Sequence, residues 1–270
     1  MIRSRTFVAL TVLWLAHSAL AQASSCPPEM AEVEDFCIDR WEARLAGQSP
    51  YLVPVSGVAE SVSGVVPQGY ISGDVAAAAC ASAGKRLCSD AEWLRACRGP
   101  TTTTYPYGDT YVAGACNDTR AVHPVIEVFG PDATFSSAEL NDPQLNQLAD
   151  SVDPTGANAA CVTAEGVFDM HGNLNEWTSD IGGTYRGGYY VEAVINGPGC
   201  LYANTAHSFV YHDYSTGFRC CAEVGFAPPI PATGSRRSWT PIAILAATFL
   251  IAAQCVRFAR GGTRREASRH

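Results

Sequence analysis

Residues 166–180 read GVFDMHGNLNEWTSD, and no other segment of the 270-residue chain is as distinctive. A turn at Gly172 separates two acidic residues, Asp169 and Glu176, which lie seven residues apart. Carboxylates held on either side of one turn repel each other unless a cation joins them. The segment therefore predicts a turn that carries a cation site. The alternative is that the two carboxylates only cap turns and bind no ion.

Four further motifs accompany this segment in a fixed order along the chain. They are GKRLCSDAEW (84–93), YPYG (105–108), RGGYY (186–190) and GFRCC (217–221). Each is weak alone, but the ordered set closely resembles the formylglycine-generating enzymes, also called sulfatase-modifying factors. The resemblance spans roughly residues 37–221. It implies the fold of that family, a mixed α and β domain with little regular secondary structure that is related to C-type lectins.

Local patterns agree with an α+β, disulfide-rich domain over residues 24–226. Asp74 is expected to cap an alanine-rich helix that ends at Gly84. Ser89 and Glu92 form a capping box for a second helix, which ends before Gly99. Three segments are expected to be strands because they are rich in aromatic and β-branched residues: 36–41, 122–129 and 189–195.

The N-terminus has the pattern of a secretory signal peptide over residues 1–23. Arg3 and Arg5 precede an apolar stretch, and small residues follow at 19–23. Cleavage after Ala21 or Ala23 is expected, with lipid attachment at Cys26 as the alternative. We therefore expect an exported protein.

The cysteines agree with export, because ten of the eleven lie between Cys26 and Cys221 and only Cys255 lies outside. An even number in an exported domain predicts five disulfides. The family resemblance implies two of them, Cys80 with Cys220 and Cys97 with Cys200. Proximity suggests a third, and elimination leaves the last two: Cys26 with Cys37, Cys88 with Cys221, and Cys116 with Cys161.

The C-terminal region predicts a membrane anchor. Residues 239–256, WTPIAILAATFLIAAQCV, carry no charge and would span about 27 Å as a helix, close to the hydrocarbon thickness of about 30 Å. We expect a Pro/Gly/Arg linker at 227–237, a transmembrane helix at 238–256 and a basic cytoplasmic tail at 257–270, with the domain outside. The alternatives are a buried C-terminal helix and a cleaved C-terminal sorting signal.

Charge is divided unevenly along the chain. Residues 24–235 contain 25 acidic and nine basic residues, whereas residues 236–270 contain seven arginines and one glutamate. The acidic domain argues against nucleic acid as a partner, since nucleic-acid binding needs a basic face. The arginines follow the anchor and agree with a cytoplasmic tail.

The resemblance also implies a copper(I) site, but this chain departs from the family pattern at the two ligand positions. Active members hold the metal between two cysteines, four and nine residues after the Arg-Gly-Gly motif, and soft thiolates suit copper(I). Here Glu192 and Gly197 occupy those positions. The nearest thiol, Cys200, is needed for a disulfide. Tyr189 and Asn175 also replace a serine and an aromatic residue of the family pattern, so no catalytic residue is assigned.

Calcium is the metal that the resemblance favours. The implied ligands of a structural ion are the side chains of Asp169 and Glu176 and the carbonyls of Gly172 and Leu174, an all-oxygen set that suits a hard cation. Asn117 is proposed for a second ion.

Another branch of the superfamily binds non-haem iron through histidines on a helical domain that this chain does not contain. For His123, His171, His207 and His212 we therefore favour loop or surface positions, although Asp213 follows His212 and would complete a two-histidine, one-carboxylate set.

Three functions follow from these observations. The first is a membrane-anchored, calcium-stabilised binding or structural module without oxidase activity, whose protein or small-molecule ligand is unknown. The second is a copper- or iron-dependent oxidase that acts on a protein or small-molecule thiol. The third is a docking chaperone for sulfatase-like substrates. Metal content distinguishes the first two.

Overall fold

The structure is a computed structural model and describes residues 25–227. These residues belong to one compact unit. The predicted signal peptide, the linker beyond residue 227, the transmembrane segment at 238–256 and the tail at 257–270 lie outside the described residues. Within residues 25–227 no helix is both long and apolar enough to cross a bilayer.

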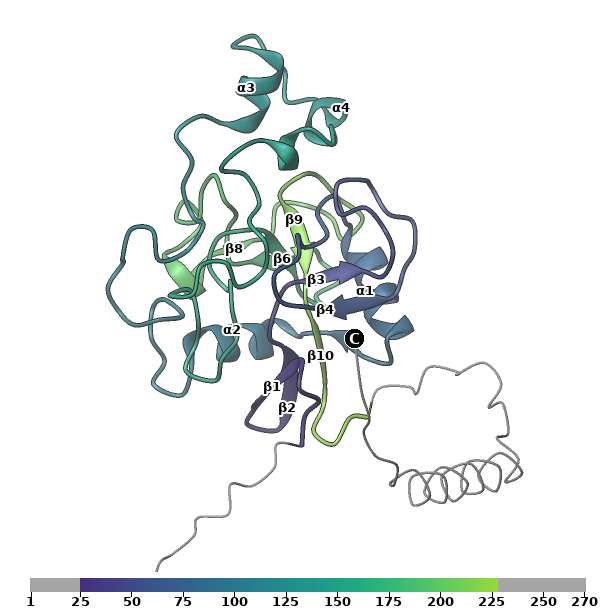
Figure 1. Ribbon diagram of the computed structural model, residues 1–270, viewed down its shortest axis with the longest axis vertical. Helices are drawn as coiled ribbons and strands as arrows, with labels where there is room; N and C mark the ends of the chain where they lie inside the picture. The colour runs from purple at the N-terminus through teal and green to yellow at the C-terminus, as the bar shows by residue number, and fades with distance from the viewer. Residues whose placement is uncertain (1–24, 228–270) are drawn as a thin grey trace, which may run out of the picture. The chain divides into compact units, whose positions relative to one another are not determined.

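The first sheet brings the two ends of the domain together. Strands β1 (Met30–Val33) and β2 (Phe36–Asp39) form a hairpin, and β10 (Cys220–Glu223) pairs with β2. A short strand, β5 (Arg86–Leu87), lies on the other side of β10, so the strand order is β1-β2-β10-β5 with antiparallel neighbours. Figure 1 shows the β1–β2 hairpin beside β10. The expected strand at 36–41 is confirmed as β2, which ends at Asp39.

The second sheet contains the most distinctive segment of the sequence. Its order is β8 (Ala203–Asn204), β7 (Tyr185–Arg186), β6 (Asn175–Trp177) and β9 (Thr216–Phe218). Strands β6 and β9 are parallel and the other neighbours antiparallel. The pairing places three of the motifs side by side, because β7, β6 and β9 each contain residues of one motif. A separate hairpin, β3 (Ala43–Leu45) with β4 (Ala59–Ser61), completes the strands.

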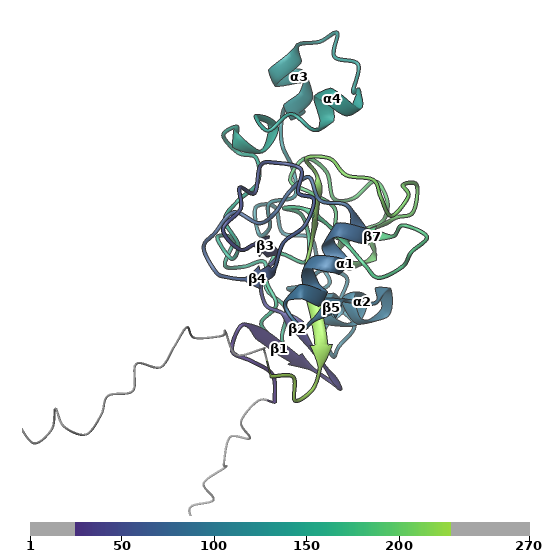
Figure 2. The same cartoon turned by 90° about the vertical axis from the view of Figure 1, so that its right-hand side faces the viewer.

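Two helices flank β5, as the sequence predicts. Helix α1 (Gly73–Ser82) has Ser72 and not Asp74 at its N-cap position, because Asp74 lies in the first turn and accepts a hydrogen bond from the Ser72 hydroxyl. The Ser72 side chain makes no hydrogen bond to the helix backbone. Helix α2 (Asp90–Arg98) begins at the expected capping box, in which Ser89 and Glu92 exchange hydrogen bonds, and ends at Gly99. Figure 2 shows both helices beside β5.

Two of the expected strands are wrong. Residues 122–129 contain helix α3 (Pro124–Phe129), because His123 caps it by accepting a hydrogen bond from the Val125 N–H and proline is favoured at the first helical position. Residues 189–195 form a turn, because the Tyr189 N–H bonds the Glu192 carbonyl and the Glu192 carboxylate accepts from two following N–H groups. The remaining short helices are α4 (Ser137–Leu140), η1 (Leu145–Gln147) and η2 (Gly199–Leu201).

Five disulfides join these elements, and they are the five expected pairs. Three close long loops, with sequence separations of 140, 133 and 103 residues: Cys80–Cys220, Cys88–Cys221 and Cys97–Cys200. The other two, Cys26–Cys37 and Cys116–Cys161, span 11 and 45 residues. Such a set of disulfides indicates an extracytoplasmic domain.

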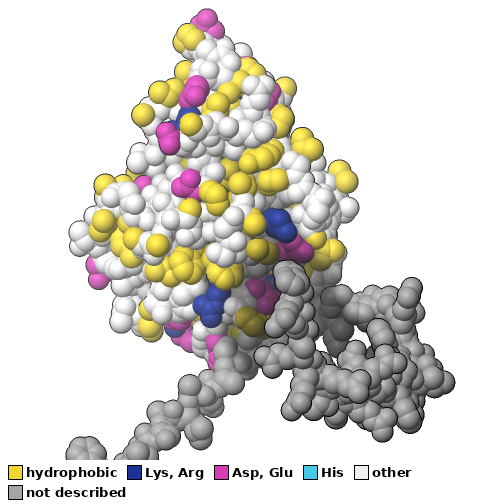
Figure 3. All heavy atoms as spheres, viewed as in Figure 1, with side chains coloured by type: hydrophobic (Ala, Val, Ile, Leu, Met, Phe, Trp, Pro, Cys, Tyr) yellow, Lys and Arg dark blue, Asp and Glu magenta, His cyan; other side chains and the backbone are white. Residues whose placement is uncertain are grey.

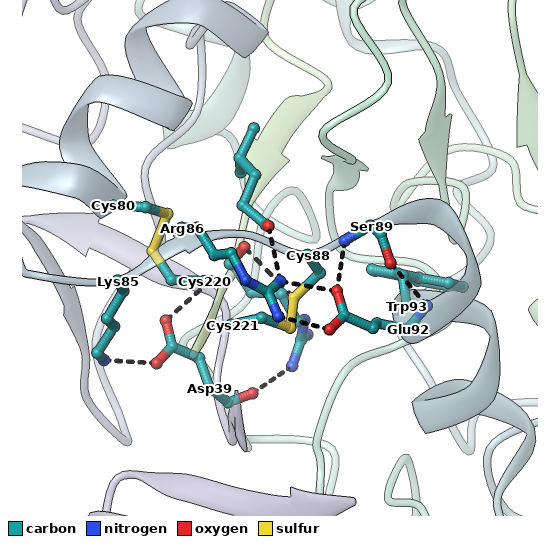
Figure 4. Close-up of a disulfide and its surroundings, with 12 residues drawn as sticks. Asp39, Cys80, Lys85, Arg86, Cys88, Ser89, Glu92, Trp93, Cys220 and Cys221 are labelled. Atoms are coloured by element: carbon teal, nitrogen blue, oxygen red, sulfur yellow. Dashed lines mark hydrogen bonds and ion pairs between the residues drawn. A yellow bond between two sulfur atoms is a disulfide. The ribbon is translucent and has the colours of Figure 1, made fainter. Parts of the chain in front are cut away.

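Strand β10 is the junction of this network (Figure 4). Its adjacent residues Cys220 and Cys221 are bonded to Cys80 of α1 and to Cys88 before α2. Side chains of adjacent strand residues point to opposite faces, so one strand can be tied on both sides. Asp39 of β2 supports the same junction by accepting from the Lys85 ammonium at 2.6 Å and from the Cys220 N–H at 2.9 Å.

Candidate functional site

The turn at Gly172 is packed against the C-terminal motif through a buried ion pair. The Arg219 guanidinium donates from Nε and Nη2 to the two carboxylate oxygens of Glu176, both at 2.5 Å. The Trp93 indole also donates to Glu176, at 2.7 Å. All three residues are fully buried. Three of the five motifs therefore meet at one carboxylate.

Two more buried carboxylates lie in the same region. Glu42 accepts from the Asn173 amide at 2.5 Å and from the Leu174 N–H at 3.1 Å, and Asp169 accepts from the Gly156 N–H at 2.7 Å. Burial, and then the charges of Asp169 and Glu176, raise the pKa of Glu42 well above its usual range. Burial likewise raises the pKa of Asp169 to about 6.

The calcium ligands expected from the sequence lie in this region. Even when Glu42 is protonated, the carboxylates of Asp169 and Glu176 outnumber the single guanidinium of Arg219 above the pKa of Asp169, and a cation would neutralise the remaining negative charge. The charge therefore fits a calcium ion, but that ion would share Glu176 with Arg219. Among residues 25–227 no three His, Cys, Asp or Glu side chains are arranged to hold a metal, although the expected set also relies on carbonyls of Gly172 and Leu174.

Asn117, proposed for a second ion, contacts the same turn. Its side-chain amide donates to the Asn173 side-chain oxygen at 3.1 Å and to the Ser151 carbonyl at 2.8 Å. Gly172 has φ of +79°, and a Cβ there would lie 2.1 Å from the Asn117 carbonyl oxygen. Only glycine fits this close approach.

Two residues that shape the local backbone, Glu192 and Gly197, occupy the positions of the family copper ligands. The Glu192 carboxylate accepts from the N–H groups of Val194 and Ile195 and so closes its own turn. Gly197 has φ of +124°, and a Cβ there would meet the Leu201 carbonyl oxygen at 2.7 Å. Cys200 is buried and bonded to Cys97. All ten cysteines within residues 25–227 are in disulfides.

Glu192 lies on the wall of a cavity of about 560 Å³. The cavity reaches β6, β7 and β8 and the loops before α3 and β9. Among residues 25–227, those that line the cavity include no lysine or arginine. They do include five tyrosines, two histidines and two carboxylates: Tyr185, Tyr189, Tyr202, Tyr211, Tyr214, His123, His207, Glu192 and Asp213. A cavity of this size is typical of a site for a small molecule or a single side chain.

Three of these rings form a stack. His207 lies between Tyr211 and Tyr185, with ring centroids 4.0 Å and 5.8 Å away and interplanar angles of 26° and 17°. The Tyr211 hydroxyl donates to Asp213 at 2.5 Å. The stack is therefore tied to a buried carboxylate at one end.

Asp213 is held rigidly in the cavity. Its other carboxylate oxygen accepts from the Ser215 N–H at 2.8 Å and from the Ser215 hydroxyl at 2.7 Å, and only 6% of the residue is exposed. After burial, which is the largest cause, the Asp213 charge raises the pKa of Tyr185 and Tyr211 above the usual range. These hydroxyls stay protonated at neutral pH.

A chain of hydrogen bonds orders another wall. The Val125 N–H donates to His123 Nδ1, so Nε2 carries the proton of the neutral ring and donates to the Tyr214 hydroxyl at 3.0 Å. Tyr214 in turn donates to the Tyr189 hydroxyl at 3.3 Å. Burial lowers the pKa of His123, which favours this neutral form, and raises the pKa of Tyr189 to about 12.

The other histidines considered for iron are dispersed. His212 Nδ1 bonds Asn141 Oδ1 at 2.7 Å, and the fully buried His171 contacts Asp118 at 3.2 Å. His123 and His207 both line the cavity with Asp213. Their rings contact other aromatic side chains, which are Phe135 and Tyr214 for His123 and Tyr185 and Tyr211 for His207.

The sequence draws attention to six residues of this region but does not predict the cavity: His123, Asn175, Tyr189, Glu192, His207 and Asp213. One signal was available, because six of the eleven tyrosines lie within residues 185–214.

Comparison with known proteins agrees with the motifs and the disulfide-rich α+β architecture. The sequence model of the sulfatase-modifying factor enzyme 1-like domain matches residues 47–226. The chain belongs to the sulfatase-modifying factor family. No sequence among curated proteins matches this family member significantly.

Solved structures that match this sulfatase-modifying factor family member are distant from it in sequence. PvdO from Pseudomonas aeruginosa is 18% identical with a TM-score of 0.45, over 70% of this chain and 80% of that one. The Major Tropism Determinant I1 variant is 13% identical with a TM-score of 0.46. The match covers 74% of this chain and 54% of that one. The Treponema denticola variable protein 1 is 14% identical with a TM-score of 0.40, and the match covers 74% of this chain and 93% of that one.

Proposed function

We propose that the chain is an exported, membrane-anchored member of the sulfatase-modifying factor family that works as a calcium-stabilised binding module without a copper oxidase centre. Residues 1–23 and the five disulfides support export, and the uncharged segment 238–256 with its arginine tail supports a single-pass anchor. The ligand is bound outside the cytoplasm, in the cavity lined by Tyr189, Glu192 and Asp213.

The observation that carries this proposal is the state of the two copper positions. Glu192 offers a hard carboxylate that is already bonded to its own turn, and Gly197 offers no side chain. Copper(I) prefers soft sulfur ligands. The described cysteines are all in disulfides, which leaves residues 25–227 without a thiolate for the metal.

An iron-dependent oxidase is the second candidate, because His123, His207 and Asp213 line one cavity. A two-histidine, one-carboxylate set can bind ferrous iron. Two of these residues are engaged elsewhere: His123 bonds the Val125 N–H and Tyr214, and Asp213 bonds Tyr211 and Ser215. We therefore favour the binding module.

The test combines metal content with an activity assay. Full-length protein purified in detergent, after incubation with copper(I), iron(II) or calcium and removal of free metal, is analysed for bound metal. The same samples are incubated with a Cys-x-Pro-x-Arg peptide, the motif that active family members modify, and aldehyde is measured. We expect bound calcium, no stoichiometric copper or iron and no aldehyde. Stoichiometric copper or iron with aldehyde above the metal-free control would overturn the proposal.

A double variant, Glu192→Cys with Gly197→Cys, tests whether restoring the two thiolates is enough to give copper-dependent oxidase activity. We expect that the copper site is not restored, because a Cβ at position 197 would meet the Leu201 carbonyl oxygen at 2.7 Å and φ there is positive. We expect no gain of aldehyde over the starting protein. The single Glu192→Cys variant is the folding control.

A further inference from the structure

The cavity that contains Glu192 is electronegative and aromatic. It has two carboxylates, Glu192 and Asp213, and its lining residues in the described part of the chain include no lysine or arginine to neutralise them. The domain as a whole is acidic, and basic side chains are sparse on the face in Figure 3. An uncompensated negative charge in a partly desolvated site attracts cations. The charge of this site therefore selects a cationic ligand.

The aromatic walls favour the same class of ligand. Tyr185, Tyr189 and Tyr211 are three of the five tyrosines in the cavity, and tyrosine faces attract ammonium groups. The rings are fixed by the His207 stack and by the Tyr214 hydroxyl chain, so little ordering is required when a ligand enters.

Asn175 supplies a third feature, which concerns hydrogen bonding. Its amide nitrogen donates to the Ser215 hydroxyl oxygen at 3.2 Å. The Ser215 hydroxyl donates its hydrogen to Asp213, so it can only accept from Asn175. The amide nitrogen of Asn175 therefore faces Ser215, and the amide oxygen points away from Ser215. Asn175 lines the cavity and is only 2% exposed, and its Oδ1 atom is buried without a hydrogen-bond partner among residues 25–227. A small rotation of the side chain is needed for a ligand to reach this oxygen. A buried acceptor of this kind calls for an N–H or O–H donor.

We propose that this cavity binds a primary alkylammonium group, with its charge facing Asp213 and Glu192 and an N–H donated to Asn175 Oδ1. A quaternary ammonium satisfies the charge and the aromatic rings but has no hydrogen for Asn175. The ammonium comes from a free amine or from a lysine side chain of an exported protein. The inference rests on the proposed function, because it names the ligand class of the same binding site.

Calorimetry on the full-length protein in detergent tests the ligand class, with butylammonium as the probe. We expect a dissociation constant at or below roughly 1 mM. Butyltrimethylammonium should bind at least about tenfold more weakly, because it cannot donate to Asn175. N-acetyl-lysine methylamide separates the two sources: binding as tight as butylammonium identifies a lysine side chain, and markedly weaker binding identifies a free amine.

Two charge-neutral variants test the site. Glu192→Gln keeps the oxygen that can accept from Val194 and Ile195, and Asp213→Asn keeps the oxygen that can accept from Ser215. Each should weaken butylammonium binding by about tenfold or more. Asp35→Asn, in the exposed turn between β1 and β2, removes the same charge at a residue that does not line the cavity and should leave affinity unchanged.

Several outcomes would overturn the inference. They are no binding at roughly 10 mM butylammonium, equal affinity in the Glu192→Gln variant and the starting protein, or tighter binding of the quaternary probe. The Glu192→Gln variant and the quaternary probe remain decisive if Asp213→Asn fails to fold. Aldehyde formation in the separate assay would instead overturn the proposed function, so the two failures are distinguishable.

Discussion

Arg219 and Glu176 form a two-point ion pair with both side chains fully buried, although 43 residues separate them in the sequence. Arg219 also donates to the carbonyls of Asp39 and Phe168, at 3.0 Å and 2.9 Å. One guanidinium thus connects β2, the segment before the Gly172 turn and β6. Three of the five motifs that identify the family are joined in space because they build this shared centre.

Replacing Glu176 with Gln should destabilise the domain strongly. The change leaves the buried Arg219 charge without its partner, which costs about 3–5 kcal/mol. Chemical denaturation of the purified full-length protein, with disulfides intact, measures the free energy of unfolding. The control is Glu60→Gln, which breaks the half-exposed Arg44–Glu60 pair and should cost less than about 1 kcal/mol. Equal losses in the two variants would contradict the assigned importance of the buried pair.

Calcium should raise the melting temperature of the starting protein, and a chelator should lower it. At a free concentration a hundredfold above the dissociation constant, a bound ion stabilises by about 2.7 kcal/mol. Asp169→Asn removes one ligand charge and should abolish most of this difference, whereas Asp35→Asn should retain it. A melting temperature that is indifferent to calcium in the starting protein would argue that Arg219 alone neutralises these carboxylates.

The long-range disulfides should contribute more than the short one. Replacing both Cys97 and Cys200 with Ser opens a loop of 103 residues and should cost about 2–5 kcal/mol. The matched variant replaces Cys26 and Cys37, only 11 residues apart, and should cost less because the shorter loop constrains the unfolded chain less. Denaturation measures both, and peptide mapping that joins Cys97 to another cysteine would refute the pairing.

Truncation before Ser238 should convert a membrane-associated protein into a soluble one. The uncharged stretch 239–256 supplies the affinity for the bilayer, and the arginines that follow it hold its end on the cytoplasmic side. Ultracentrifugation of cell extracts, with detection of the domain in pellet and supernatant, measures the distribution. Full-length protein in the supernatant would show that the segment is no anchor or that it is removed.

Much of the local structure could be predicted from the sequence. The capping box at Ser89 and Glu92 starts α2 because its hydrogen bonds involve residues three apart. The strand at Phe36 could also be read from nearby residues. By contrast, residues 122–129 read as a strand because their β-branched and aromatic side chains outweighed the helix start at His123 and Pro124. The strand expected at 189–195 failed because Glu192 bonds its own turn.

The sequence alone determined the family, the excess of acidic residues and the number of cysteines available for disulfides, because these depend on residue identity and order. The tertiary structure decided which side chains contact one another. It paired Arg219 with Glu176, and it gathered Tyr185, Asn175 and Asp213 around one cavity from strands and loops distant in sequence. No local pattern encodes such a site, since each contact depends on how β6 and β9 pair and on which loops then meet beside them.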